Sequence, residues 1–274
     1  MIKIVVAGAA GRMGQTIINT LPEFPELTLV GAVERPDHPN LNQESVPGIP
    51  VSSDVDKTLQ AGDVLIDFTT PSGTLQNLKS CLKLRKGIVI GTTGFRQQEL
   101  SEIKTAGEKI PILLSPNMSL GVNLLFHLTE ETARYLPDYE VEIVETHHNQ
   151  KADAPSGTAL RLAEIITTTR KQNLDEAAVY GRHGRPGPRK NSEIGIHAIR
   201  TGDVVGEHTI IFGTTGERLE LTHKAGSRQA FARGALKAAL FVSQQKAGFY
   251  TMSALLNLTS CKPKGLPYIG IGRT

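Results

Sequence analysis

A short apolar run followed by three spaced glycines opens the chain. Residues 2–7, IKIVVA, are rich in β-branched side chains and predict a buried strand, and residues 8–14, GAAGRMG, follow at once. Apolar side chains at Met13, Ile17, Ile18 and Leu21 share one helical face and predict a helix directly after the glycines. A strand, a glycine turn and a helix in this order indicate a parallel α/β sheet, and no other stretch constrains the fold as much.

The next hundred residues repeat this alternation. Near-continuous apolar runs predict further strands, buried on both faces, at residues 27–33, 64–70, 87–92 and 110–115. Helical patterns lie between them, including one that begins at Ser72 and one from Gln97 to Lys109. The first 115 or so residues therefore predict a Rossmann-like, doubly wound parallel sheet.

The pattern changes after residue 118. Helices are predicted at residues 119–136, 156–171 and 229–245, a strand at 139–148, and period-two strands between 194 and 224. We therefore expect an α/β protein with a second α+β domain that has a mixed sheet. The predicted division is 1–118 with 228–258 for dinucleotide binding and 119–227 for substrate binding and oligomerisation. Residues 259–274 form an irregular tail in this prediction.

The glycine turn has the context of a nucleotide site. Glycines let the backbone approach a pyrophosphate, and the following helix start offers free N–H groups. The spacing is GxxGxxG, with Ala10 where the second glycine of the usual motif would be, so a plain tight turn is the alternative. Glu34, 20 residues past Gly14, suits a ribose hydroxyl and thus NAD, whereas Arg35 suits the 2′-phosphate of NADP. The pair predicts a site that accepts either cofactor, NADPH or NADH; two exposed charges at a strand end are the alternative.

Three further strand ends carry polar residues with glycine or proline. They read DFTTPSGT (67–74), GTTGF (91–95) and SPNMSLG (115–121). Ligands of such sheets bind outside the carboxyl ends of the strands. These segments therefore predict the rest of a cofactor cleft, although each one alone is common turn chemistry.

Residues 145–159, ETHHNQKADAPSGTA, concentrate titratable side chains. In a strand His147 and His148 point to opposite sides, so we expect them to have different roles. Lys151 adds a positive charge or a second acid, and Ser156, Gly157 and Thr158 begin a helix whose N–H groups suit a carboxylate. The segment predicts a site for a small dicarboxylate beside a proton donor. One packed and one exposed histidine, without chemistry, is the alternative.

The sequence argues against a metal site, nucleic-acid binding and a membrane span. No metal is expected, because adjacent strand histidines diverge and no third ligand has a familiar spacing. The net charge of +3 is weak evidence for nucleic acid, and the basic segment GRHGRPGPRK (181–190) is expected to be a mobile, solvated loop. No apolar run approaches the roughly 20 residues that a membrane span needs. Two cysteines in 274 residues make no disulfide framework and favour a reducing, cytoplasmic location.

Together these motifs resemble the 4-hydroxy-tetrahydrodipicolinate reductase family, also called dihydrodipicolinate reductases. The resemblance runs from residue 1 to about 258 and rests on ETHHNQKADAPSGTA and GAAGRMG. The further matching stretches are GTTGF, SPNMSLGVN (115–123), RTGDVVGEHT (200–209), LTHKA (221–225) and FARGALKAA (231–239). Met118 stands at a position where the family often has phenylalanine. The residues after about 258 extend beyond the usual C-terminal end of the family.

The resemblance implies a role for each matching residue. His147 is the proton donor and acceptor and Lys151 a proton donor, while His148, Ser156, Gly157 and Thr158 hold the substrate. The implied dinucleotide-binding residues are Gly8, Ala9, Ala10, Gly11, Arg12, Met13, Glu34, Arg35, Gly91, Thr92, Thr93, Ser115, Pro116, Asn117 and Met118. The implied reaction reduces a cyclic dicarboxylate with NADH or NADPH, with loss of water, in the diaminopimelate route to lysine. The family is usually a homotetramer that pairs its C-terminal sheets, and one final helix, about 228–258, returns to the nucleotide domain.

Three other functions stay open from the sequence. Another nicotinamide dehydrogenase of the same architecture would not turn over the ring substrate. A redox-sensing binder of NAD(P) would bind the cofactor without a substrate-dependent rate. A nucleic-acid-binding protein would show affinity that falls steeply with salt.

Overall fold

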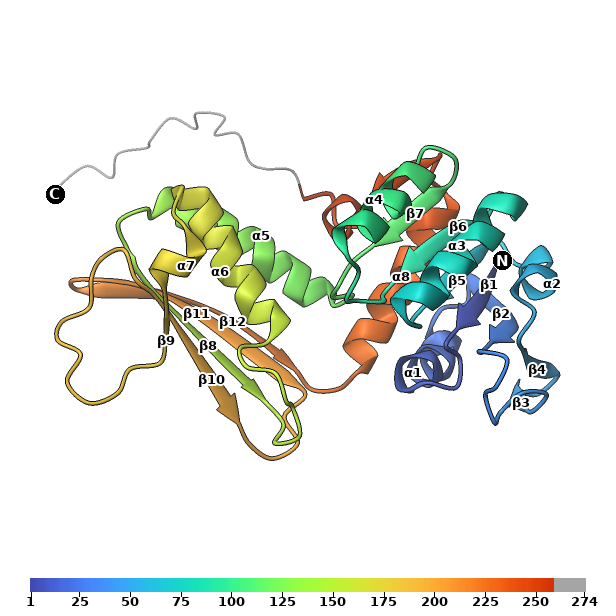
Figure 1. Cartoon of the computed structure of the whole chain (residues 1–274), viewed down its shortest axis with the longest axis horizontal. Coiled ribbons are helices and arrows are strands. Elements are labelled where there is room, and N and C mark those ends of the chain that lie inside the picture. Colours follow the sequence, from blue (N-terminus) through green and yellow to red (C-terminus); the bar gives the residue numbers. More distant parts are fainter. Residues whose placement is uncertain (259–274) are drawn as a thin grey trace, which may run out of the picture.

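The computed structural model describes residues 1–258, which contain two sheets joined through α5 and the segment before α8 (Figure 1). The predicted tail at 259–274 lies outside the described residues. No helix within the described part is long and apolar enough to cross a membrane.

The first sheet has eight strands in the order β13-β7-β6-β5-β1-β2-β4-β3. All neighbouring pairs are parallel except β3 with β4. The strand bounds are β1 Ile2–Ala7, β2 Leu27–Val33, β3 Glu44–Val46, β4 Ile49–Ser52, β5 Val64–Asp67, β6 Gly87–Ile90, β7 Pro111–Leu114 and β13 Gly248–Tyr250. The chain leaves β1 toward β2 on one side and returns to β5 on the other. This reversal creates the crevice in which such sheets bind ligands.

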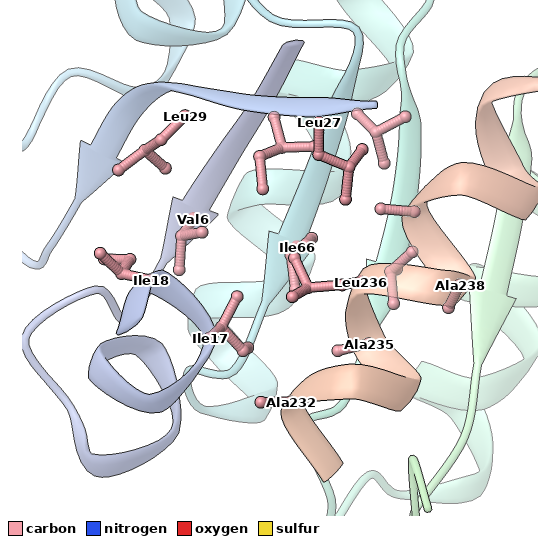
Figure 2. Close-up of a cluster of buried hydrophobic side chains, with 14 of the residues drawn as sticks. Val6, Ile17, Ile18, Leu27, Leu29, Ile66, Ala232, Ala235, Leu236 and Ala238 are labelled. Atoms are coloured by element: carbon pink, nitrogen blue, oxygen red, sulfur yellow. The ribbon is translucent and has the colours of Figure 1, made fainter. Parts of the chain in front are cut away.

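Helices cover both faces of this sheet, and the alternation within β1 explains why. Ile4 and Val6 face α1 (Arg12–Thr20) and α8 (Gln229–Ser243), whose Ile17 and Leu236 pack against them (Figure 2). Val5 and Ala7 face a separate apolar cluster on the other side. That cluster includes side chains of α2 (Val55–Gln60), α3 (Pro71–Leu84) and α4 (Gln97–Ala106). Strands buried on both faces give the continuous apolar runs from which the parallel sheet was predicted.

The second sheet is mixed, with the order β12-β11-β8-β10-β9. Its strands are β8 Glu140–His147, β9 Ala178–Tyr180, β10 Ile194–Arg200, β11 Gly206–Thr214 and β12 Glu217–Ala225. β8 pairs parallel with β10 and antiparallel with β11. Helices α5 (Leu120–Tyr135) and α6 (Gly157–Arg170) cover one face, where Phe212 is fully buried; the short α7 is Leu174–Ala177. The predicted fold class, a doubly wound parallel sheet plus an α+β part with a mixed sheet, is confirmed.

The expectation of one final helix over 228–258 is wrong. After α8 the chain forms β13, which pairs in parallel with β7, and then the short α9 (Met252–Leu255). The segment Gly248–Tyr250 contains two aromatic residues, which favour a strand, and it satisfies hydrogen-bonding groups of β7 that an edge position would leave unpaired. The return to the first sheet is therefore made by three elements.

The basic segment 181–190 has no helix or strand and is exposed except at Gly181 and Arg189, as expected of a solvated loop, but two of its arginines have acidic or backbone partners. The Arg182 guanidinium forms two hydrogen bonds with Glu142 on β8, at 2.9 and 3.0 Å. Arg189 donates to the backbone oxygen of Glu193 at 2.7 Å and lies 3.3 Å from the Glu142 carboxylate. Two of its basic side chains are therefore held against the sheet by acidic partners, which reduces the charge available to a polyanion.

Candidate functional site

The glycine turn after β1 is packed too closely for larger residues. Gly8 has a φ of +76°, and a Cβ there would lie 2.5 Å from the Phe68 carbonyl oxygen. A Cβ at Gly14 would lie 2.1 Å from the Gly8 oxygen. The glycines thus let α1 start against the ends of β1 and β5, beside a cleft that Gly8 and Gly11 line.

This cleft, of about 500 Å³, contains several of the predicted nucleotide residues. Gly8, Gly11, Glu34 and Arg35 all line it, together with the β5–α3 segment around Phe68. The Glu34 carboxylate accepts a hydrogen bond from the Ala10 N–H at 2.9 Å, so it is fixed beside the glycine turn. Arg35 is exposed and pairs with Asp37 at 3.2 Å. A fixed carboxylate and a movable guanidinium at one strand end suit a ribose hydroxyl and a phosphate, respectively.

A buried carboxylate, which the sequence did not single out, orders the neighbouring strand ends. Asp67, fully buried at the end of β5, accepts hydrogen bonds from the hydroxyls of Thr69, Thr74 and Thr92 and from the Asn77 amide, at 2.7 to 3.1 Å. Thr92 is itself 5% exposed, so its hydroxyl serves this network. The network connects the β5–α3 segment, which lines the cleft, with Thr92 of the β6–α4 segment.

The segments predicted to border the nicotinamide lie next to this network. Gly91 contacts the Phe68 ring, which a Cβ at Gly91 would meet at 2.3 Å. Ser115 donates to the Asn117 carbonyl oxygen at 2.7 Å, which closes a tight turn before α5. Met118 is 2% exposed and packs in the apolar core, so only its backbone is available near the cleft. Thr93 and Pro116 are exposed beside these turns, and Ala9 is buried behind the glycine turn.

The two histidines stand at the end of β8, and both line one cleft although opposite sides were expected. His147 lies on the buried face, with 9% of its surface exposed, and half-buried His148 follows at the strand end. His147 Nδ1 lies 2.5 Å from the Glu145 carboxylate, which is fully buried and also forms two 2.8 Å hydrogen bonds with Arg200 of β10. Burial lowers the pKa of His147 below its ordinary value, and the Glu145 carboxylate opposes that shift.

The first turn of α6 is joined to the same group. Ser156 caps the helix through a 3.2 Å hydrogen bond from the Ala159 N–H, and its own N–H donates to Glu145 at 2.9 Å. Its hydroxyl also lies 3.0 Å from His208 Nε2, and the His208 ring packs edge-on against His147. Burial, then the neighbouring His147, lowers the pKa of His208 to about 4, so His208 is neutral near pH 7. Ser156 is thus buried, while Gly157 and Thr158 present the helix start.

A second cleft, of about 650 Å³, brings the two parts of the molecule together. His147, His148 and Lys151 line it from the second sheet, and Arg12 and Met13 line it from the glycine turn. The Lys151 ammonium lies 2.7 and 2.9 Å from the two carboxylate oxygens of Asp153. Asn117 donates to the Thr158 hydroxyl at 3.3 Å, which joins the segment before α5 to the start of α6. The predicted proton donors therefore lie in one cleft with the turn predicted to bind the cofactor.

Several residues around these clefts were not predicted from the sequence. Glu145 stands two positions before His147, and the same strand alternation that buries His147 also buries Glu145, so a signal was present. Arg200 and His208 reach the site only through the pairing of β10 and β11 with β8. Arg228 and Phe231, at the start of α8, line the second cleft from a segment more than 70 residues away in the sequence. Within residues 1–258 no three His, Cys, Asp or Glu side chains are grouped as metal ligands would be.

Comparison with known proteins gives consistent matches over nearly the whole chain. Residues 2–118 match the family model for the dihydrodipicolinate reductase N-terminus, and residues 121–256 match that for its C-terminus. A 4-hydroxy-tetrahydrodipicolinate reductase from Nitrosomonas europaea is 48% identical over 264 residues, which cover 94% of this chain and 98% of the relative. The corresponding protein from Burkholderia thailandensis is 45% identical over 263 residues, covering 93% and 98%.

A solved structure matches as well. The dipicolinate-bound dihydrodipicolinate reductase from Paenisporosarcina sp. TG-14 superposes with a TM-score of 0.78 at 28% identity, and the match covers 94% of this chain and all of that one. Two family models that together span nearly all of residues 2–256, and relatives far above 30% identity, decide the assignment. The chain belongs to the dihydrodipicolinate reductase family, also named the 4-hydroxy-tetrahydrodipicolinate reductases.

Proposed function

We propose that the cleft between the glycine turn and the end of β8 is the active site for the family's reaction. The chain is an NAD(P)H-dependent oxidoreductase that reduces 4-hydroxy-tetrahydrodipicolinate to tetrahydrodipicolinate, with loss of water, in the diaminopimelate route to lysine. One observation supports this location above all others. His147 and Lys151, both able to donate a proton, share a cleft with Arg12 and Met13 of the glycine turn.

The residues around the first cleft fit a dinucleotide. Gly8 and Gly14 let α1 begin close against the glycine turn, and the N–H groups at the start of α1 suit a pyrophosphate. We assign cofactor contacts to the predicted residues of the glycine turn, to Glu34 and Arg35, and to the segments Gly91–Thr93 and Ser115–Met118, with Met118 acting through its backbone. When bound, the nicotinamide supplies a hydride to C4 of the substrate ring.

The second cleft supplies binding and proton transfer. The ring's carboxylates are held by Lys151 and by the start of α6 at Gly157 and Thr158, with His148 beside them and Ser156 capping the helix. Asp153, 62% exposed at its side chain, is released from Lys151 when a substrate carboxylate takes its place. His147 supplies or relays the proton that balances the hydride, so that one reduced cofactor and one proton are consumed per water released.

The assay that tests this function uses substrate made freshly by the preceding synthase from aspartate semialdehyde and pyruvate. Oxidation of NADPH and NADH is followed by absorbance. Substrate-dependent oxidation is the expected result. Cofactor binding without any substrate-dependent rate would instead indicate a redox-sensing binder, and turnover of other substrates but not of this ring would indicate a different dehydrogenase.

Glu34 and Arg35 are expected to set the cofactor preference in opposite directions. Replacing Glu34 with alanine removes a carboxylate that bonds a ribose hydroxyl and repels a 2′-phosphate, so the NADPH:NADH ratio of kcat/KM should rise by about tenfold or more. Arg35→Ala should lower the same ratio. The two ratios are measured in parallel at fixed ionic strength. Equal ratios in both variants and the unmodified protein would remove both residues from the cofactor site.

We further propose that residues 1–118 and 228–258 act as the dinucleotide-binding domain and residues 119–227 as the substrate and oligomerisation domain. The packing of α8 against α1 and the first sheet supports this division. We also propose that the enzyme works in the cytoplasm. The low cysteine content, two in 274 residues, supports a reducing compartment.

We propose a homotetramer in which copies meet through the second sheet. Within the described residues, α5 and α6 pack on one face of that sheet, and Val144, Thr209 and Ile211 lie on the other. Ile199, 44% exposed, continues this apolar face on β10. Light scattering in solution is expected to give four times the mass of one chain, and Ile211→Lys with Val144→Lys should give a smaller assembly. A monomeric mass for the unmodified chain would contradict the proposal.

A further inference from the structure

One carboxylate contacts both the proposed proton donor and the proposed substrate-holding helix. Glu145 Oε2 lies 2.5 Å from His147 Nδ1, and Glu145 Oε1 accepts the Ser156 N–H at 2.9 Å. Arg200 donates to both oxygens at 2.8 Å, and none of the Glu145 surface is exposed. The carboxylate is therefore fully engaged and held from three elements: β8, β10 and the start of α6.

This arrangement decides which nitrogen of His147 faces the cleft. Because Nδ1 is directed at Glu145, Nε2 is the nitrogen left for the substrate side. Gly206 on β11 leaves room at that atom, since a Cβ there would lie 3.0 Å from Nε2. The His208 ring, 5.2 Å away between centroids, packs edge-on and restricts rotation of the imidazole.

We infer that Glu145 is the positioning residue of this site: its single carboxylate orients the His147 ring and fixes the first turn of α6 relative to it. The acid and the helix start that holds a substrate carboxylate are thereby kept in one geometry. Arg200 compensates the buried negative charge, which would otherwise be costly. This inference rests on the proposed function of His147, and Glu145 itself does not contact the substrate in it.

The charges around His147 come from several elements. From the second sheet and the loop after β8, the neighbours are Glu145, His148, Lys151 with Asp153, Arg200 and His208. Arg12 of α1 and Arg228 before α8 line the cleft from the first part of the molecule, and Asp203 of the β10–β11 connection lines it from the second. Among the groups named here that shift the His147 pKa, Glu145 raises it, whereas Lys151 and Arg200 lower it. Removing the Glu145 charge should therefore move the His147 pKa further down.

The test compares Glu145→Gln with Glu142→Gln, a matched control on the same strand. Glu142 also bonds a histidine, His197 at 2.7 Å, and an arginine, Arg182, but on the opposite face of the sheet. For Glu145→Gln we expect kcat/KM for the ring substrate to fall by about 10- to 100-fold, with NADPH affinity unchanged. The limb on which kcat/KM falls as pH rises should shift to lower pH, because less imidazolium remains at a given pH. Glu142→Gln should keep the rate within about twofold and its profile in place.

A double variant separates this inference from the proposed function. If Glu145 acts through His147, adding Glu145→Gln to His147→Gln should cost little beyond the single His147 change. Additive losses, or equal losses in Glu145→Gln and Glu142→Gln with no shift of the pH profile, would overturn the positioning role. Glu145→Asp, which keeps the charge, should restore the position of the pH limb. If His147→Gln alone keeps full turnover, the proposed acid is wrong, whereas an inactive His147→Gln beside a fully active Glu145→Gln rejects only the present inference.

Discussion

Replacing His147 with glutamine should lower kcat by about 10²- to 10⁴-fold, the usual cost of removing a positioned proton donor, while NADPH still binds. The side chain lines the second cleft and not the first, so its loss removes a donor without changing the nucleotide contacts. Glutamine keeps a polar group of similar reach next to Glu145, which limits damage to the fold. Steady-state kinetics with the ring substrate and a fluorescence titration with NADPH measure the two effects separately.

Lys151→Met is expected to lower kcat by a similar factor and to raise KM for the substrate as well. The ammonium is both a proton donor and a charge partner, and its present partner is the exposed Asp153 carboxylate. His183→Gln and Lys104→Met change exposed residues that line neither cleft, and they serve as matched controls that should keep full activity. Near-normal turnover in both His147→Gln and Lys151→Met would reject the assignment of the proton donors.

The pH dependence of the rate shows whether His147 or Lys151 donates the proton. Burial keeps the pKa of His147 below its ordinary value, so near pH 7 most of the imidazole is neutral. Activity that relies on imidazolium should therefore fall as pH rises, starting below pH 7. A rate that stays level through this range in the unmodified protein would assign the proton to Lys151 and leave His147 as an orienting group.

Much of the fold followed from the sequence because buried parallel strands have a recognisable composition. The sequence runs that form the parallel strands are apolar on both faces, and each begins or ends near a glycine or proline. These strands are β1, β2, β5, β6 and β7. The single helix over 228–258 was implied by the family resemblance, whereas the periodicity of residues 229–245 predicted only the helix that the structure shows as α8. Phe249 and Tyr250 favour a strand by type, and the edge of β7 with which they pair is not visible in the local sequence.

The site was predictable to the extent that its residues are neighbours in the chain. His147, Lys151 and Ser156 to Thr158 lie within one segment, and strand alternation predicted the buried position of His147, whereas His148 lies beyond the end of β8 and lines the same cleft. Arg200 and His208 depend on the register in which β10 and β11 pair with β8, which local patterns do not specify. Asp67 illustrates the same limit, because its partners Thr74, Asn77 and Thr92 come from two further segments.

Gly14→Ala is expected to weaken NADPH binding by at least about tenfold and to lower the free energy of unfolding by about 1–3 kcal/mol. The new methyl group would lie 2.1 Å from the Gly8 oxygen and 2.7 Å from the Ala9 Cα. Both are backbone atoms, so no side chain can rotate away, and α1 must move off the glycine turn. That movement displaces the glycine turn, whose Gly8 and Gly11 line the first cleft, together with the N–H groups at the start of α1, which couples the loss of stability to the loss of cofactor affinity.

Gly213→Ala is the control for this change, because a Cβ at Gly213 meets no atom within 4 Å and the residue lies on β11, outside the cofactor cleft. This change should alter the free energy of unfolding by no more than about 0.5 kcal/mol. Urea unfolding and NADPH titration of both variants give the two quantities. If Gly14→Ala lost stability but bound NADPH normally, the helix start would not be a cofactor contact and the glycine spacing would serve packing alone. Normal stability with weak binding would instead mean that the turn yields to the methyl group, and that the position of its N–H groups alone determines the affinity.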